Sequence, residues 1–180
     1  MNPNQPKISI FVMPRRHAHM KLSIVALLFF TFPMLVQSKP TIQHFDKKVF
    51  FSVMKSGNPD EVNEELNLLN TSAASEKDGY EGALMMQKAG LLKIPAERLK
   101  LFKKGRIKLE TAIYNDRDNT EYRFLRLIIQ EHAPKIVKYK TDLETDKEHI
   151  KKNFRDLALS VQEAIRDYSK NSKVLSPQDF

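Results

Sequence analysis

Three polar residues on one predicted helix form the candidate binding site of this chain. Arg123, Arg126 and Gln130 are spaced by three and four residues, which places them on neighbouring parts of one helical face. A guanidinium donates two parallel N–H groups to a carboxylate, so the predicted chemistry is capture of an acidic or carboxylate-bearing partner. The alternative is that these side chains are solvated or pair with Glu121 and nearby acids.

Histidines and acids outside this patch lack the spacing of a metal site. Of His44, His132 and His149, the last two each follow a glutamate directly, whereas zinc ligands on one helix lie a turn apart. Acids alternate through residues 142–148 and at 116–118. The first segment lacks the glycine of a calcium loop and the second lacks its final glutamate. We therefore assign no metal and no cofactor.

The sequence contains none of the short motifs that mark common catalytic sites. No Gly-x-Ser-x-Gly elbow, phosphate loop or dinucleotide fingerprint occurs, and cysteine is absent. Without cysteine the chain has no disulfide, no thiolate nucleophile and no lipid-modified cysteine. We assign no catalytic residue and do not expect an enzyme. The alternative is an enzyme whose site is assembled only by folding.

Charge is distributed unevenly along the chain. The formal net charge is +8, but residues 1–38 hold four basic residues and no acid, and the remainder holds 26 basic and 22 acidic residues. An excess of only +4 in the remainder does not favour nucleic acid as a partner. One basic cluster is predicted to be a solvated face, with weak contact to anionic lipid headgroups or polysaccharide as the alternative: Lys100, Lys103, Lys104, Arg106 and Lys108.

The first 38 residues are predicted to be an export signal. Lys21 precedes an apolar run over 22–35, which is shorter than the roughly 20 residues of a membrane span. Compact residues before the Ser38–Lys39 bond match a signal-peptidase site. Met20 is the expected start, and the processed chain is expected in the periplasm or medium. An uncleaved N-terminal anchor is the alternative.

Apolar spacing predicts an all-α domain over residues 39–170. Gly57 and the pair Asn58-Pro59 read as a helix stop and the next helix start, and Gly105 on an apolar stripe indicates close approach of a neighbouring helix. Residues 49–54 could instead form a strand, and 171–180 are expected to be a flexible tail. The helices are expected near 45–57, 58–70, 80–90, 95–113, 122–132, 134–139 and, as one long element, 150–165.

The predicted helix pairs suggest an irregular, tetratricopeptide-like array of antiparallel pairs, although the repeat signature is absent. The stretch Asn119–Pro134, followed by Tyr139 and Asp146, resembles a group of uncharacterised exported helical proteins of Bacteroidota type. Residues 80–83 (Tyr-Glu-Gly-Ala) and 102–105 (Phe-Lys-Lys-Gly) are similar to that group as well. The resemblance implies a signal peptide and a helical fold, and it implies no function.

These patterns together favour a non-catalytic interaction module of the periplasm or cell envelope. Stacked helix pairs would offer a surface to an envelope protein or peptide, with Arg123, Arg126 and Gln130 as the contact residues. This hypothesis rests on fold-level analogy. Its alternatives are an envelope enzyme and a basic surface that binds anionic lipid or glycan.

Overall fold

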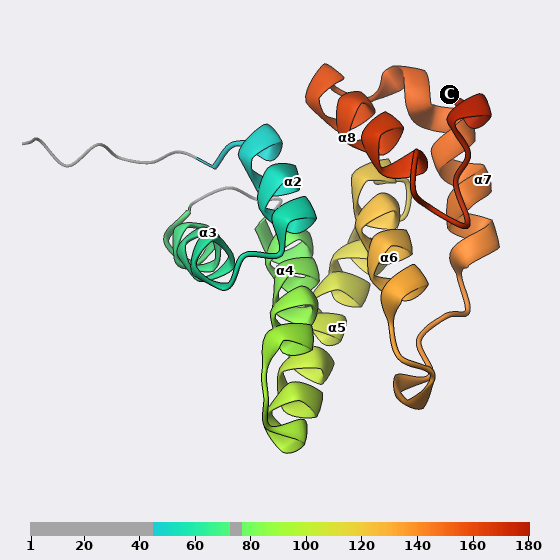
Figure 1. Ribbon diagram of the computed structural model, residues 1–180. Coiled ribbons are helices and arrows are strands. Elements are labelled where there is room, and N and C mark those ends of the chain that lie inside the picture. Colours follow the sequence, from blue (N-terminus) through green and yellow to red (C-terminus); the bar gives the residue numbers. More distant parts are fainter. Residues whose placement is uncertain (1–44, 73–76) are drawn as a thin grey trace, which may run out of the picture. The chain divides into compact units, whose positions relative to one another are not determined.

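The computed structural model describes residues 45–72 and 77–180, and within them every regular element is a helix. The predicted all-α class is therefore confirmed for this part of the chain (Figure 1). The predicted export signal, its cleavage site and His44 lie outside the described residues.

The first two helices begin and end close to the residues that the local sequence predicts. Helix α2 (Lys47–Ser56) begins where the Asp46 carboxylate accepts hydrogen bonds from two backbone N–H groups, and it ends at Gly57, whose φ is 60°. A left-handed φ suits glycine, which has no Cβ to clash. The Asn58 side chain then caps α3 (Pro59–Thr71). The strand alternative for residues 49–54 is wrong because α2 contains them all.

Helices α4 (Lys77–Leu91) and α5 (Pro95–Asn115) form a helical hairpin with their backbones in contact. A Cβ on Gly105 would lie 2.5 Å from the carbonyl oxygen of Gly82, and one on Gly82 would lie 2.6 Å from the backbone nitrogen of Leu109. No side chain fits at either position. The close helix approach predicted at Gly105 is confirmed, and its partner is Gly82.

The C-terminal part begins with α6 (Thr120–His132), which the Asn119 side chain caps, and continues through the short turn η1 (Lys135–Val137). The prediction of one helix over 150–165 is wrong. The chain forms α7 (Leu143–Asn153), the turn η2 (Phe154–Asp156) and α8 (Leu159–Ser169). The helix is interrupted at Leu157 and Ala158, whose backbones are extended with ψ of 152° and 146°. Phe154 still reaches the core at 5% exposure.

Residues 171–180, predicted to be a flexible tail, make specific contacts with the domain. The Glu131 carboxylate accepts hydrogen bonds from the Ser172 hydroxyl (2.7 Å) and the Lys173 backbone N–H (2.6 Å). Leu175 is only 2% exposed. A final turn, η3 (Pro177–Asp179), is closed by a capping box. Individual side chains anchor residues 171–180 to the domain, so this segment does not need apolar residues at helical spacing.

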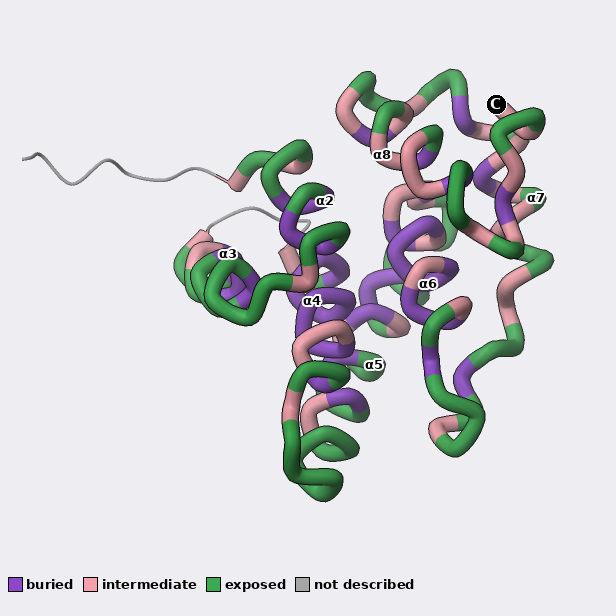
Figure 2. Tube along the Cα trace, viewed as in Figure 1, coloured by how far each residue is buried: buried purple, intermediate pink, exposed green. Residues whose placement is uncertain are grey.

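The inner faces of the helices share one apolar core (Figure 2). Val49 and Leu99 lie outside it at 50% and 45% exposure, although helical spacing aligns them with the buried Val53 and Phe102. On α2 the stripe is displaced by one position because Phe50 and Phe51 fill the core instead. Larger apolar surface is buried preferentially when two helical faces compete.

Candidate functional site

The structure brings the three predicted site residues together on α6 and pairs them with acids of α5 and α7. Arg126 donates from Nε and Nη2 to the two carboxylate oxygens of Asp146, both at 2.7 Å, and from Nη1 to Glu110 at 3.0 Å. Arg123 Nη1 lies 3.2 Å from the same Asp146. Gln130 Nε2 donates to Asp142 at 2.9 Å and its Oε1 accepts from the Asp142 backbone N–H.

This group is a buried ionic network that joins three helices. Asp146 and Gln130 are fully buried and Arg126 is 7% exposed. Burial alone would lower the pKa of Arg126, but the bonds to Asp146 raise it above its ordinary value. Burial and the nearby Glu110 together raise the pKa of Tyr139, whose hydroxyl donates to Glu110. Removing either partner of the Arg126–Asp146 pair would leave an uncompensated buried charge, which is strongly destabilising.

The partner-binding role of these residues stays a prediction. Arg123 and Arg126 line a hollow of about 620 Å³ together with Glu110. Arg126 and Gln130 use their polar atoms inside the domain. The acid named in the sequence alternative does not join them, because Glu121 pairs with Lys47 at 2.9 Å. No local spacing connects Arg126 with Asp146, which follows 20 residues later.

The other sequence candidates occupy separate places. His132 Nε2 lies 3.3 Å from the Tyr168 hydroxyl, and His149 Nε2 lies 3.1 Å from Thr120 Oγ1. Among residues 45–72 and 77–180, no group of three or more histidines and acids is arranged to hold a metal ion. In the basic cluster, Lys108 pairs with Asp78 and Glu81, and Arg106 stacks 4.6 Å from the centre of the Tyr139 ring.

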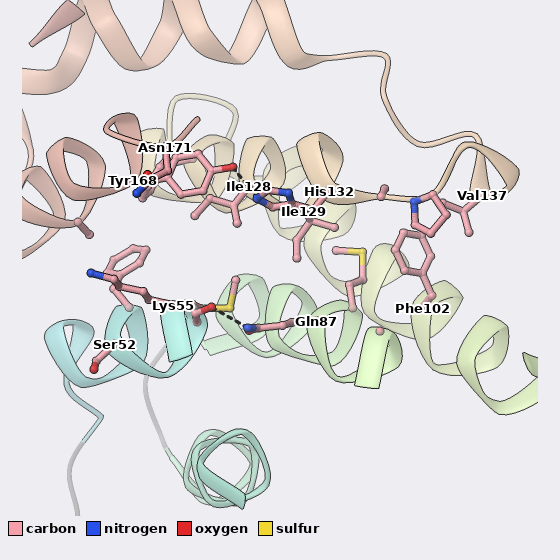
Figure 3. Close-up of a pocket in the computed structure, with 18 of the residues that line it drawn as sticks. Ser52, Lys55, Gln87, Phe102, Ile128, Ile129, His132, Val137, Tyr168 and Asn171 are labelled. Atoms are coloured by element: carbon pink, nitrogen blue, oxygen red, sulfur yellow. Dashed lines mark hydrogen bonds between the residues drawn. The ribbon is translucent and has the colours of Figure 1, made fainter. Parts of the chain in front are cut away.

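The described chain also contains a large apolar groove that the sequence does not reveal. It has a volume of about 1090 Å³ and runs between α2, α4 and the start of α5 on one side and α6, η1 and α8 on the other (Figure 3). Aromatic, aliphatic and methionine side chains dominate its lining, among them Phe51, Met54, Met86, Phe102, Phe124, Ile128, Ile129, Val137, Ala164 and Tyr168. We refer to this feature as the groove.

Polar side chains also line the groove, and some of them are bonded to the protein. Gln87 Nε2 donates to the Met54 carbonyl at 2.6 Å, while its Oε1 is buried with no hydrogen-bond partner among the described residues. The Tyr168 hydroxyl donates to Glu131 at 2.7 Å, and burial together with this carboxylate raises the pKa of Tyr168. At the rim, Lys55 and Asp167 form an ion pair at 2.6 Å.

Sequence analysis missed the groove because its walls come from six elements spread over residues 48–171. Each apolar lining residue reads locally as an ordinary core position. Even Leu99, which is 45% exposed and lines the groove, has the helical spacing of a core residue relative to the buried Phe102.

The length and composition of the described helices show whether any of them could span a membrane. None of those within residues 45–72 and 77–180 combines the length and apolar composition that a bilayer span requires.

No protein-family model, curated protein or solved structure matches the chain, so the groove and the ionic network are interpreted from their geometry.

Proposed function

We propose that the protein is a non-catalytic interaction module of the periplasm or cell envelope whose groove binds a short amphipathic helix of a partner protein. The observation that carries this proposal is the apolar groove of about 1090 Å³ between two helical walls. Amphipathic helices bind such grooves through anchors spaced by three, four and seven residues. The helix pairs α2–α3, α4–α5 and α6–α7 form, in this proposal, an irregular tetratricopeptide-like array around it.

The size of the groove sets the length of the ligand. A helix is a cylinder of diameter about 10–12 Å that rises about 1.5 Å per residue. A volume of about 1090 Å³ therefore corresponds to roughly eight residues, or about two turns. The expected ligand is a short helical segment with two or three large apolar anchors.

The rim charges favour a polypeptide ligand. Lys48 and Glu163 line the groove from α2 and α8, and neither takes part in an ion pair within the described residues. Lys55 and Asp167 add one charge of each sign. A rim with both signs complements the mixed polar face of an amphipathic helix.

A peptide-binding experiment tests the proposal. The probes are an 11-residue model helix (about three turns) with leucines at helical spacing and a scrambled peptide of the same composition. We expect the amphipathic peptide to bind more tightly and to shift the NMR signals of Ile128 and Ala164, which line the groove. Ile128→Glu, which places a charge in the groove, is expected to weaken binding roughly tenfold or more.

The matched control is Ile107→Glu, since Ile107 is 68% exposed and lies outside the groove. It is expected to leave binding unchanged. Equal binding of the scrambled peptide, or an equal loss in the control variant, would overturn the proposal. Tighter binding of a fatty acid than of any helical peptide would make the groove a lipid site instead. A photo-crosslinker at the exposed, groove-lining Ser52 then identifies the natural segment in cells.

A further inference from the structure

Four exposed aliphatic side chains lie near the turn between α4 and α5 and on η1. Leu91 and Ile94 flank the turn between α4 and α5 and are 41% and 53% exposed, while Leu99 is 45% and Ile136 88% exposed. Leu99 and Ile136 line the same groove from its two opposite walls. The α4–α5 turn and η1 lie at the same end of the domain in Figure 1 and are exposed in Figure 2. We call these four residues the apolar tip.

Cations surround the apolar tip almost without acids. Residues 88–104 contain six lysines or arginines and one acid, Glu97, and residues 135–140 contain three lysines and no acid. Several of these lysines are exposed and take part in no ion pair within the described residues, namely Lys93, Lys100, Lys103, Lys104, Lys135 and Lys138. The tip thus differs from the opposite rim of the groove, where both signs occur.

The backbone at the tip holds these side chains outward. The turn of η1 is closed by a hydrogen bond from Lys138 N to Lys135 O, with Lys138 at φ 47°, a left-handed conformation that is unfavourable for a lysine. At the start of α5, the cap position is Ile94, which has no side-chain cap bond, although polar residues are preferred there. Arg98 fixes that turn by donating to the Leu92 carbonyl at 2.6 Å. Two locally unfavourable features, the left-handed backbone of Lys138 and the apolar cap residue Ile94, thus accompany the aliphatic groups on the surface.

We propose that the apolar tip docks on an anionic membrane surface, with its aliphatic side chains in the headgroup region and its lysines against the lipid phosphates. Surfaces that combine Leu or Ile with flanking Lys or Arg bind at this interface. A second copy of the chain is a poorer partner, because a two-fold interface would bring the same cations face to face. This inference goes beyond the proposed function and does not depend on it.

A fluorescence experiment tests the docking, since the chain contains no tryptophan. Ile136→Trp and, as a matched control, Ile107→Trp each introduce one emitter at an exposed isoleucine. With vesicles of phosphatidylcholine and about one third phosphatidylglycerol, the emission of Ile136→Trp is expected to shift to the blue, and that of Ile107→Trp is not. Because both variants share the same N-terminal residues, their difference reports the tip alone.

A second measurement tests how much the lysines contribute to vesicle binding. Lys93→Glu combined with Lys135→Glu, made in the Ile136→Trp chain, is expected to weaken binding to the anionic vesicles roughly tenfold or more. The control Lys152→Glu alters an exposed α7 lysine and is expected to leave binding unchanged. Binding should also weaken as salt rises from about 0.05 to about 0.3 M.

Three results would overturn the proposal. These are an equal blue shift in both tryptophan variants, an equal shift with vesicles of phosphatidylcholine alone, and no shift with any vesicle. A blue shift that grows with protein concentration without vesicles would assign the tip to self-association instead. Ile128→Glu in the groove is expected to leave vesicle binding intact, so failure of the groove proposal and failure of this one are distinguishable.

Discussion

Replacing Gly105 by alanine tests the backbone contact that joins α4 and α5. The added Cβ would lie 2.5 Å from the Gly82 carbonyl oxygen, whereas ordinary contact begins at 3.4 Å, so the helices must separate by roughly 1 Å and lose a quarter to a half of their local contact energy. Overpacking of this kind costs about 3 kcal/mol when backbone cannot yield. Alanine returns about 1 kcal/mol of helix propensity. We expect a net loss of about 2 kcal/mol.

Gly90→Ala is the matched control on the same hairpin, because nothing lies within 4 Å of its added Cβ. It is expected to stabilise the protein by about 1 kcal/mol through helix propensity alone. Urea denaturation followed by circular dichroism measures both free energies of unfolding. Gly82→Ala should resemble Gly105→Ala, and the double variant should cost less than the two single changes added, since one separation relieves both clashes. A neutral or stabilising Gly105→Ala would refute the backbone contact.

Three further predictions concern charge and processing. Asp146→Ala should lower the free energy of unfolding by about 3–5 kcal/mol, since it leaves the buried Arg126 without its main partner; denaturation measures the loss. Burial would raise the pKa of Glu131, but the hydrogen bonds that it accepts lower it below its ordinary 4.5. Its stabilisation is therefore present above that value and is lost as pH falls through the folded-state pKa, and Glu131→Gln should remove this part of the acid dependence of unfolding. Finally, the processed protein should begin at Lys39 and Leu28→Arg should block its export, whereas N-terminal sequencing that finds earlier residues in the exported product would contradict the cleavage site.

Local chemistry explains what the sequence predicted correctly. Gly57, Asn58 and Pro59 each determine the backbone at their own position, so the end of α2 and the start of α3 could be located without knowledge of the fold. Gly105 carried information about a neighbour, because a glycine on a buried helical stripe is costly unless a close contact uses it. The identity of that neighbour, Gly82, required the structure.

The helical spacing of apolar residues gave a wrong prediction over residues 150–165, because one long helix and two helices with a break bury the same side chains. Ile150, Phe154, Val161 and Ile165 are all buried, as one continuous helix would require. The chain reaches the same burial with a break, because two extended residues after η2 redirect it before α8 begins. Apolar spacing reports which side chains enter the core and does not report whether the backbone between them is straight.

The candidate site was the least predictable feature because it depends on contacts between distant elements. Arg126 and Gln130 were identified as polar residues on one helical face, and that placement holds. Their burial depends on Asp142 and Asp146, which the sequence presented as part of an alternating acidic segment. The groove has no local signal at all, since α2 and α8 meet across it from opposite ends of the described chain.

The ionic network and the groove are connected through α6. One face of this helix presents Phe124, Ile128 and Ile129 to the groove, and another holds Arg126 against Asp146. The network therefore fixes the position of one groove wall without lining it.

If the arginines contact the partner directly, Arg123→Ala should reduce binding while leaving stability unchanged. If they only position α6, binding and stability should fall together, and a groove change such as Ile128→Glu should reduce binding alone. Measuring both quantities on the same variants separates direct contact from positioning, and the burial of Arg126 at 7% exposure favours positioning.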